Sequence, residues 1–240
     1  MASTLTRDEA RDRARLIDVH SYQVDLDLTR GDKTFTSVTT VAFCCSRPGA
    51  DSYIDLTALA IQEIILNGEA VEPSACDGDR IALAGLQAEN ELRVVADCEY
   101  SRGGEGLHRF EDPADGGVYL YSDLETFDAH RIYACFDQPD LKATFELAAT
   151  VPRGWEVASN MAASSEPEPV EDDSAGVMPA GEGAARWTFP PTPVMSTYIT
   201  AIAAGPYHVV RSEHDGIPLE IFCRQSLAPY LNPDEIFEVT

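Results

Sequence analysis

The sequence has few bases, few cysteines and no long apolar run. Its 240 residues hold 17 lysines and arginines against 41 aspartates and glutamates, a formal net charge of −24, and Lys33 and Lys142 are the only lysines. Because such a charge repels phosphate groups, we expect neither nucleic acid nor an anionic membrane as a partner, and cationic partners are favoured. Scarce lysine is typical both of salt adaptation and of a genome rich in G and C, and the composition does not separate the two.

Signals that send a chain to a membrane are missing as well. No apolar run approaches the roughly 18 residues of a membrane-spanning helix. The stretch MASTLTRDEARDRARL is charged from Arg7 onward and has no apolar signal core, so we expect a cytoplasmic protein. The six cysteines show no CxxC pair and no regular spacing, which predicts free thiols packed as small hydrophobic side chains.

The common catalytic motifs are absent too. None of the five histidines has a partner histidine four residues away, so HExxH is missing, and neither GxSxG, a P-loop nor a dinucleotide fingerprint occurs. His130 and Cys135 form a conceivable dyad, but residues five apart in a strand face opposite sides. We therefore expect Cys135 in the core and His130 at the surface. No cluster of metal ligands is visible, and we expect no metal site within these residues.

The N-terminal third shows clear secondary-structure patterns. Residues 6–15 predict a short polar helix, capped by Thr6 with Glu9 three residues later. KTFTSVTTVAFCC follows SYQVDLDLTR after a Gly31-Asp32 turn, which predicts a hairpin of two strands. The first of these strands is expected to be half buried, because one of its faces holds Tyr22, Val24, Leu26 and Leu28.

The same alternation continues along the chain in short strands such as IQEIIL, NELRVVADCEY and TYITAIAAGPYHVV. With Gly, Pro, Asn and Asp between them, these strands predict an all-β fold, a saddle-like stack of antiparallel sheets of the β-sandwich type. Residues 101–117 are expected to form a long loop. Residues 164–185, rich in acids, Pro and Gly, are either a domain linker or an exposed hairpin tip. We favour the tip and expect residues 164–183 to be exposed.

A pair of acids stands at the end of one predicted strand. In YLYSDLETFDAHRIYACFDQPD, Asp123 and Glu125 are two residues apart, so in an extended segment both side chains leave the same face with Cβ atoms roughly 7 Å apart. They can converge on one cation. The alternative is a solvated acidic strand edge that discourages aggregation. Further on, Asp137, Pro139 and Asp140 predict a turn.

The run from Gly106 to Phe145 resembles the aminopeptidase N family of zinc metallo-aminopeptidases, and WEVASNM, MSTYITAIAAGPY and HSYQVDLDL look like other strands of that family's N-terminal domain. The resemblance covers nearly the whole chain. It implies a saddle-shaped all-β domain that packs on a thermolysin-like catalytic domain. It also implies that zinc belongs to the full-length enzyme, because the family's HExxH and GAMEN motifs lie in the catalytic domain.

The resemblance assigns roles to the acid pair. The family's TQxE-like segment matches SDLE here, so the acid that binds the free α-amine of the substrate falls on Glu125 and the usual glutamine falls on Asp123. Asp123 is a departure, as are His130, where the family often has Arg, and Gln138, where it often has Glu. These changes leave the fine geometry of the loop open.

Three parts are expected: an N-terminal arm or short helix over 1–16, a β-saddle domain over 17–230, and over 231–240 the start of a connection to a catalytic domain. The implied function is that of a non-catalytic domain, inactive alone, of an aminopeptidase that removes N-terminal residues from peptides. The alternative is a stand-alone β-sandwich interaction module. A reading frame that continues past Thr240 into GAMEN and HExxH would exclude the module.

Overall fold

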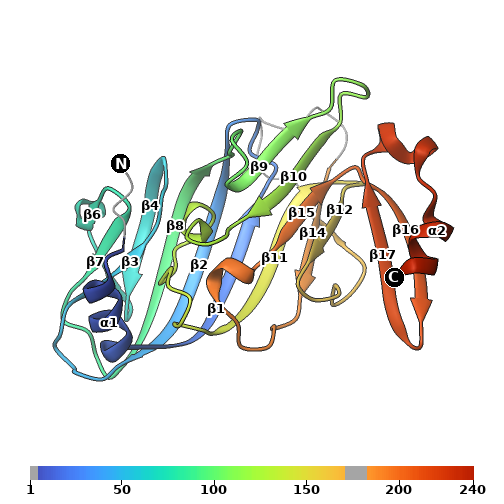
Figure 1. Cartoon of the computed structure of the whole chain (residues 1–240). Coiled ribbons are helices and arrows are strands. Elements are labelled where there is room, and N and C mark those ends of the chain that lie inside the picture. The colour runs from blue at the N-terminus through green and yellow to red at the C-terminus, as the bar shows by residue number, and fades with distance from the viewer. Residues whose placement is uncertain (1–4, 171–182) are drawn as a thin grey trace.

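The computed structural model describes residues 5–170 and 183–240 (Figure 1). Helix α1 (Arg7–Leu16) begins after Thr6. The Thr6 hydroxyl accepts a hydrogen bond from the backbone N–H of Glu9, and the Glu9 carboxylate accepts one from the backbone N–H of Thr6. This reciprocal capping box confirms the predicted helix start. The helix is not exposed all round, because Arg13 and Leu16 are buried.

The strands in the described residues form four sheets, and the largest has eight strands. In it the β1–β2 hairpin is confirmed. One pair of neighbouring strands departs from the predicted antiparallel arrangement. Strands β1 (Ile17–Asp27) and β11 (Thr144–Pro152) are parallel to each other, and Tyr22 of β1 lies opposite Phe145 of β11. In spatial order the strands are β13 (Glu168–Val170), β14 (Ala184–Phe189), β11 (Thr144–Pro152), β1 (Ile17–Asp27), β2 (Thr34–Cys45), β8 (Glu89–Glu99), β4 (Ala60–Leu66) and β5 (Glu69–Ala70).

The other sheets are smaller, and short helical turns connect them. Residues 101–117 were predicted as a long loop, and that prediction is wrong, because strand β9 (Gly106–Glu111) lies inside this segment. The glycines on both sides of GLHRFE are typical of a loop and hide the signal of this six-residue strand. The sheets contain β12 (Glu156–Ser159), β15 (Ile202–Gly205), β10 (Val118–Asp123) and β9 (Gly106–Glu111); β3 (Ser52–Asp55), β7 (Arg80–Leu83) and β6 (Cys76–Asp77); and β16 (His208–His214) with β17 (Ile217–Cys223). The helical segments are η1 (Pro73–Ala75), η2 (Ala129–Arg131), η3 (Thr197–Ile199), η4 (Gln225–Tyr230) and α2 (Pro233–Val239).

One face of the eight-stranded sheet is buried. Along β2 and β8 every second residue is buried and the intervening residues are partly or fully exposed, and β1 follows the same pattern except at a bulge between Val19 and Ser21. The buried residues form one cluster with Ile54 of β3, Leu120 of β10 and their neighbours, so the three-stranded and four-stranded sheets pack on the same face. The prediction of an all-β, sandwich-like stack with a short N-terminal helix is confirmed. Figure 1 shows the three-stranded sheet and α1 at one end and the β16–β17 hairpin at the other.

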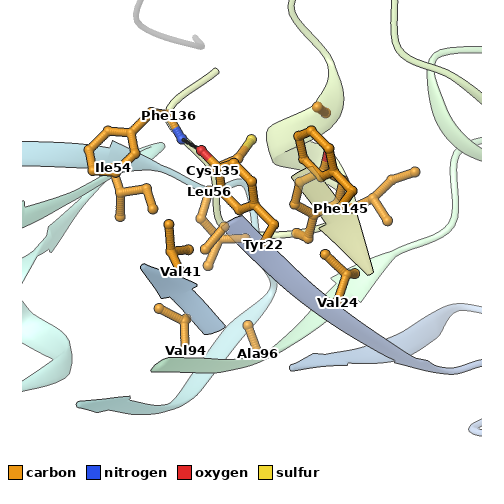
Figure 2. Close-up of a cluster of buried hydrophobic side chains, with 14 of the residues drawn as sticks. Tyr22, Val24, Val41, Ile54, Leu56, Val94, Ala96, Cys135, Phe136 and Phe145 are labelled. Atoms are coloured by element: carbon orange, nitrogen blue, oxygen red, sulfur yellow. Dashed lines mark hydrogen bonds between the residues drawn. The ribbon is translucent and has the colours of Figure 1, made fainter. Parts of the chain in front are cut away.

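Tyr22 lies at the centre of this core. Its ring stacks on Phe145 with centroids 4.7 Å apart, and its hydroxyl accepts the backbone N–H of Phe136 at 3.1 Å (Figure 2). The polar end of a buried tyrosine is therefore satisfied by the chain segment that crosses the sheet. All six cysteines are free thiols, as predicted. None of the helices in the described residues is long and apolar enough to cross a membrane.

The sheet ends at two short strands within the described residues. Strand β5 has two residues, and β13 has three, among them Pro169. Val170 of β13 pairs antiparallel with Ala184 of β14, as expected for the two sides of a hairpin. Residues 164–170 are largely exposed, as predicted. The rest of the predicted exposed segment, residues 171–182, lies outside the described residues.

Glu9 joins α1 to β7. Its carboxylate accepts hydrogen bonds from Arg80 at 2.7 Å and from the Thr6 amide at 2.8 Å. These bonds, that of Arg80 first, lower the pKa of Glu9 from 4.5 to about 2. Because the folded-state pKa is the lower one, the charged form stabilises the fold above pH 4.5, and this contribution is lost as the pH falls from 4.5 through about 2.

We expect Glu9→Gln to lower the free energy of unfolding by about 1 kcal/mol at pH 7, because solvent screens an ion pair as exposed as this one. The Glu9 side chain is 36% exposed. Urea unfolding at pH 7, 4 and 2 measures the difference between variant and parent, which should vanish near pH 2. Asp12→Asn, at an exposed position of the same helix, is the control. A deficit for Glu9→Gln that is equally large at every pH would contradict the assignment.

Candidate functional site

Strand β10 carries Asp123 at its last position, and Glu125 follows in the next turn. The strand lies between β9 and β15, and Asp123 is opposite Gly106 of β9. Leu124, between the two acids, is 3% exposed and belongs to the core, whereas both acids are exposed. Both carboxylates therefore point away from the core, and a buried leucine fixes the segment that presents them.

Neither acid has a partner among the residues that the structure describes. Within the described residues, no hydrogen bond or ion pair reaches the carboxylate of Asp123 or Glu125. Gly106, opposite Asp123, has a φ of +70°, and a Cβ on it would lie 3.1 Å from the Cβ of Arg131, so any other residue there would be strained. The Nε of Arg131 donates to Asp128 at 2.5 Å. The pair is thus left with two uncompensated negative charges at the surface, which suits a cationic ligand.

The loop that carries Glu125 is held from behind by a buried carboxylate. Asp137 is 0% exposed. It accepts three hydrogen bonds: from the backbone N–H of His130 at 3.1 Å, from the ring Nδ1–H of His130 at 2.8 Å, and from the Thr197 hydroxyl at 2.7 Å. These donors replace the water that the carboxylate loses on burial. His130 follows Glu125 by five residues, so the two hydrogen bonds from His130 to Asp137 fix the end of the loop that comes after Glu125.

Further hydrogen bonds extend from Asp137 to the N-terminal helix. The backbone N–H of Asp137 donates to Asp55 at 3.1 Å, and Asp55 accepts Nη1 of Arg13 at 2.6 Å. The Nε of Arg13 donates to Gln138 at 3.0 Å, and Nε2 of Gln138 donates to the carbonyl of Ala10 at 2.8 Å. Burial raises the pKa of Asp55, and Arg13 opposes that rise. We call the six side chains the polar core network: Arg13, Asp55, His130, Asp137, Gln138 and Thr197.

Two predictions about this region are wrong. His130 is 2% exposed instead of lying at the surface, because it belongs to η2 rather than to a strand and pairs with Asp137. Asp137 belongs to the polar core network rather than to a turn, although Pro139 and Asp140 do form one. Cys135 is buried as expected, and burial raises the pKa of its thiol, which therefore stays protonated and unreactive.

The residues that the structure describes do not fit a zinc site. Among positions 5–170 and 183–240, no three His, Cys, Asp or Glu side chains come together in a group that could hold a metal ion. A structural or catalytic zinc needs at least three convergent protein ligands. The acid pair alone is too small a set.

Comparison with known proteins assigns the fold. A profile of the Peptidase M1 N-terminal domain matches residues 19–199, a range that includes the acid pair and the polar core network apart from Arg13. The chain belongs to the M1 peptidase N-terminal domain family. The resemblance seen in the sequence is confirmed.

Relatives of this M1 N-terminal domain are much longer proteins. It is 49% identical to Aminopeptidase N of Streptomyces lividans over 246 residues, which cover 99% of the chain and 27% of that protein. It is 24% identical to human Aminopeptidase N, covering 100% of the chain and 27% of the relative. With Probable aminopeptidase 1 of Sulfurisphaera tokodaii the identity is 25%, over 82% of the chain and 23% of the relative. The M1 N-terminal domain thus spans about a quarter of these relatives.

Neutralising the exposed acids Asp123 and Glu125 should change the stability of the fold much less than neutralising the buried Asp137. We expect Asp123→Asn and Glu125→Gln each to change the free energy of unfolding by less than about 0.5 kcal/mol, because both are exposed and unpaired. Asp137→Asn should lower it by roughly 3 kcal/mol, because it leaves buried donors without their charged partner. Urea unfolding of the three variants at pH 7 measures this. A loss above about 1 kcal/mol for Glu125→Gln would mean that the fold itself uses this carboxylate.

Proposed function

We propose that this chain is the non-catalytic N-terminal domain of a zinc-dependent aminopeptidase that removes N-terminal residues from peptides. Glu125, with Asp123 beside it, binds the free α-ammonium group of the substrate. The proposal rests on one observation, an exposed and unpaired acid pair at the end of β10 in an M1 N-terminal domain. Relatives that contain this domain are named aminopeptidases, which supports it.

The chemistry of an exopeptidase accounts for the carboxylate. Such an enzyme must hold the α-ammonium at a fixed distance from the scissile bond, and a carboxylate does so through charge-assisted hydrogen bonds. At about 4 Å and an effective dielectric constant near 20, the attraction is roughly 4 kcal/mol before desolvation. A rigid support makes this attraction useful, and here Leu124 and His130 are both buried on either side of Glu125.

The zinc of the full-length enzyme belongs to its catalytic domain. Because the described residues of this chain do not fit a zinc site, we assign them no hydrolytic step. Their part is to bind and orient the substrate amine. The cytoplasmic location expected from the sequence stays a prediction, as does a role in peptide catabolism.

The catalytic domain is the partner that we infer for an apolar surface near the C-terminus. Tyr230 is 84% exposed and Val239 is 81% exposed. Since the relatives are about four times as long as this chain, the catalytic domain is available to cover these side chains. A stand-alone module would leave them in water, which favours the aminopeptidase over the module. We use the name apolar surface for the exposed large apolar side chains of β17, η4 and α2: Ile217, Leu227, Tyr230, Ile236 and Val239.

Glu125→Gln in the full-length enzyme tests amine binding. We expect kcat/KM for peptides with a free amine to fall by about ten- to a thousandfold, equivalent to roughly 1.4 to 4 kcal/mol. Asp123→Asn restores an amide like the family's usual glutamine and should cost much less. Steady-state kinetics on a free-amine peptide measure both.

Two controls separate amine binding from a general loss of activity. An N-acetylated peptide is a poor substrate because its nitrogen carries no charge, and Glu125→Gln should make little further difference to it. Glu91→Gln, at an exposed position of β8, should leave the kinetics unchanged. If Glu125→Gln stays within about twofold of the parent on free-amine peptides, the pair is a solvated strand edge.

The chain of 240 residues should hold no stoichiometric zinc and hydrolyse no aminoacyl substrate. The physical reason is the lack of convergent ligands in its described part. Elemental analysis after dialysis, alongside an assay with a chromogenic aminoacyl amide, tests this. One tightly held zinc per chain together with peptidase activity that co-purifies would reveal a site within the chain and overturn the assignment of hydrolysis to another domain.

A further inference from the structure

The turn between β9 and β10 holds a segment that lies more than a hundred residues later in the chain. Asp112, in this turn, is 3% exposed. One of its carboxylate oxygens accepts two hydrogen bonds, from Nη1 of Arg224 at 3.0 Å and from the hydroxyl of Ser226 at 2.6 Å. The other accepts the amide of Ala114 at 2.9 Å. The aspartate thus has both oxygens engaged, one within its own turn and one with the distant segment.

Two more side chains of the same hairpin bind the backbone of that segment. Asp115 accepts the amide of Ser226 at 3.0 Å and the hydroxyl of Tyr119 at 3.2 Å. The Tyr119 hydroxyl in turn accepts the amide of Gln225 at 3.0 Å. Two successive backbone N–H groups therefore end on side chains of the β9–β10 hairpin, which fixes both the position and the direction of the chain there.

Charge and aromatic packing support the same contact. The Ser226 hydroxyl, followed by the Ala114 amide, lowers the pKa of Asp112, so the carboxylate is charged at neutral pH. The guanidinium of Arg224 lies over the ring of Phe110, 4.9 Å from its centroid. Burial raises the pKa of Tyr119, so its hydroxyl keeps the proton that it donates to Asp115.

The β16–β17 hairpin is joined to the rest of the fold mainly through this region. The ring of Tyr207 makes edge contacts with Tyr119 and with Phe222 of β17, and its hydroxyl donates to the carbonyl of Leu120 at 3.2 Å. Another link is an ion pair of Arg211 with Glu156, but the Arg211 side chain is 58% exposed. Exposed pairs contribute little, whereas hydrogen bonds to a desolvated carboxylate are strong.

We propose that Asp112, Asp115 and Tyr119 form a clamp that fixes residues 224–230, and with them the apolar surface of β17, η4 and α2, relative to strand β10. The same strand ends at Asp123 of the acid pair, about 13 Å from Tyr119 at the usual rise per residue. On the proposed function, the clamp sets where Glu125 stands relative to the catalytic domain. Its members touch no substrate and act as positioning residues.

Hydrogen exchange of the chain of 240 residues tests the clamp itself. In Asp112→Asn and in Tyr119→Phe, the amides of 225–230 should exchange at least about tenfold faster, while those of β1 and β2 keep their rates. Ser226→Thr keeps the hydroxyl and should behave like the parent, whereas Ser226→Ala should not. Asp25→Asn removes a bidentate pair with Arg186 on the large sheet and is the matched control. Exchange within twofold of the parent in Asp112→Asn would overturn the clamp.

Kinetics of the full-length enzyme test the positioning role. Asp112→Asn should raise KM for a free-amine peptide about three- to tenfold with kcat within twofold, and this rise should disappear when Glu125 is already glutamine. A purely structural role would instead lower the amount of folded enzyme and leave KM unchanged. Faster exchange with an unchanged KM would therefore overturn positioning. If Glu125→Gln has no kinetic effect but exchange is faster, the amine-binding function fails and the clamp stands.

Discussion

The buried carboxylate of Asp137 is the constraint on which the rest of the structure depends. A charge removed from water must be hydrogen bonded by the protein, and the donors here come from parts of the chain that are far apart. His130 is supplied by η2 and Thr197 by η3, while the Asp137 amide engages Asp55 of β3. The carboxylate can be satisfied only when these elements are in place, so the loop ahead of η2 has one position.

The departures from the family's usual residues fall into two physical classes. His130 and Gln138 belong to the polar core network, and each is hydrogen bonded to a charged member of it. These two replacements therefore lie in the buried network that holds the loop, away from the exposed acid pair. Asp123 is exposed and has no partner within the described residues, so a different side chain there changes the surface charge and leaves the hydrogen bonds that hold the loop intact. The buried end of the loop is hydrogen bonded, whereas the carboxylates of its two exposed acids make no hydrogen bond within the described residues.

Local patterns in the sequence predict what depends on neighbouring residues. Alternation marked β1 with Tyr22 on its buried face, and the Thr6 and Glu9 pair marked the start of α1. Local patterns fail where partners are distant. Arg13 bonds to Gln138 across 125 residues and Arg224 to Asp112 across 112, and nothing near either residue announces the other.

The same reasoning explains the element and the pairing that were missed. Strand β9 is short and bordered by glycines, so its own residues barely alternate in burial. The parallel pairing of β1 with β11 joins strands more than a hundred residues apart. For the acid pair, spacing alone favours a solvated strand edge over a ligand site. The resemblance to a family is what favours the ligand site, and that assignment stays a prediction.

The short strands at the borders of the large sheet affect how the molecule behaves when crowded. A sheet recruits another chain through a free row of N–H and C=O groups. Strand β5 offers two residues, one of them Glu69, and β13 offers three, of which Pro169 has no N–H and Glu168 carries a charge. In the described part of the chain, the charges of Glu69 and Glu168 and the missing N–H of Pro169 oppose the pairing of an incoming strand with these two border strands. The strong negative charge adds repulsion between copies of the domain.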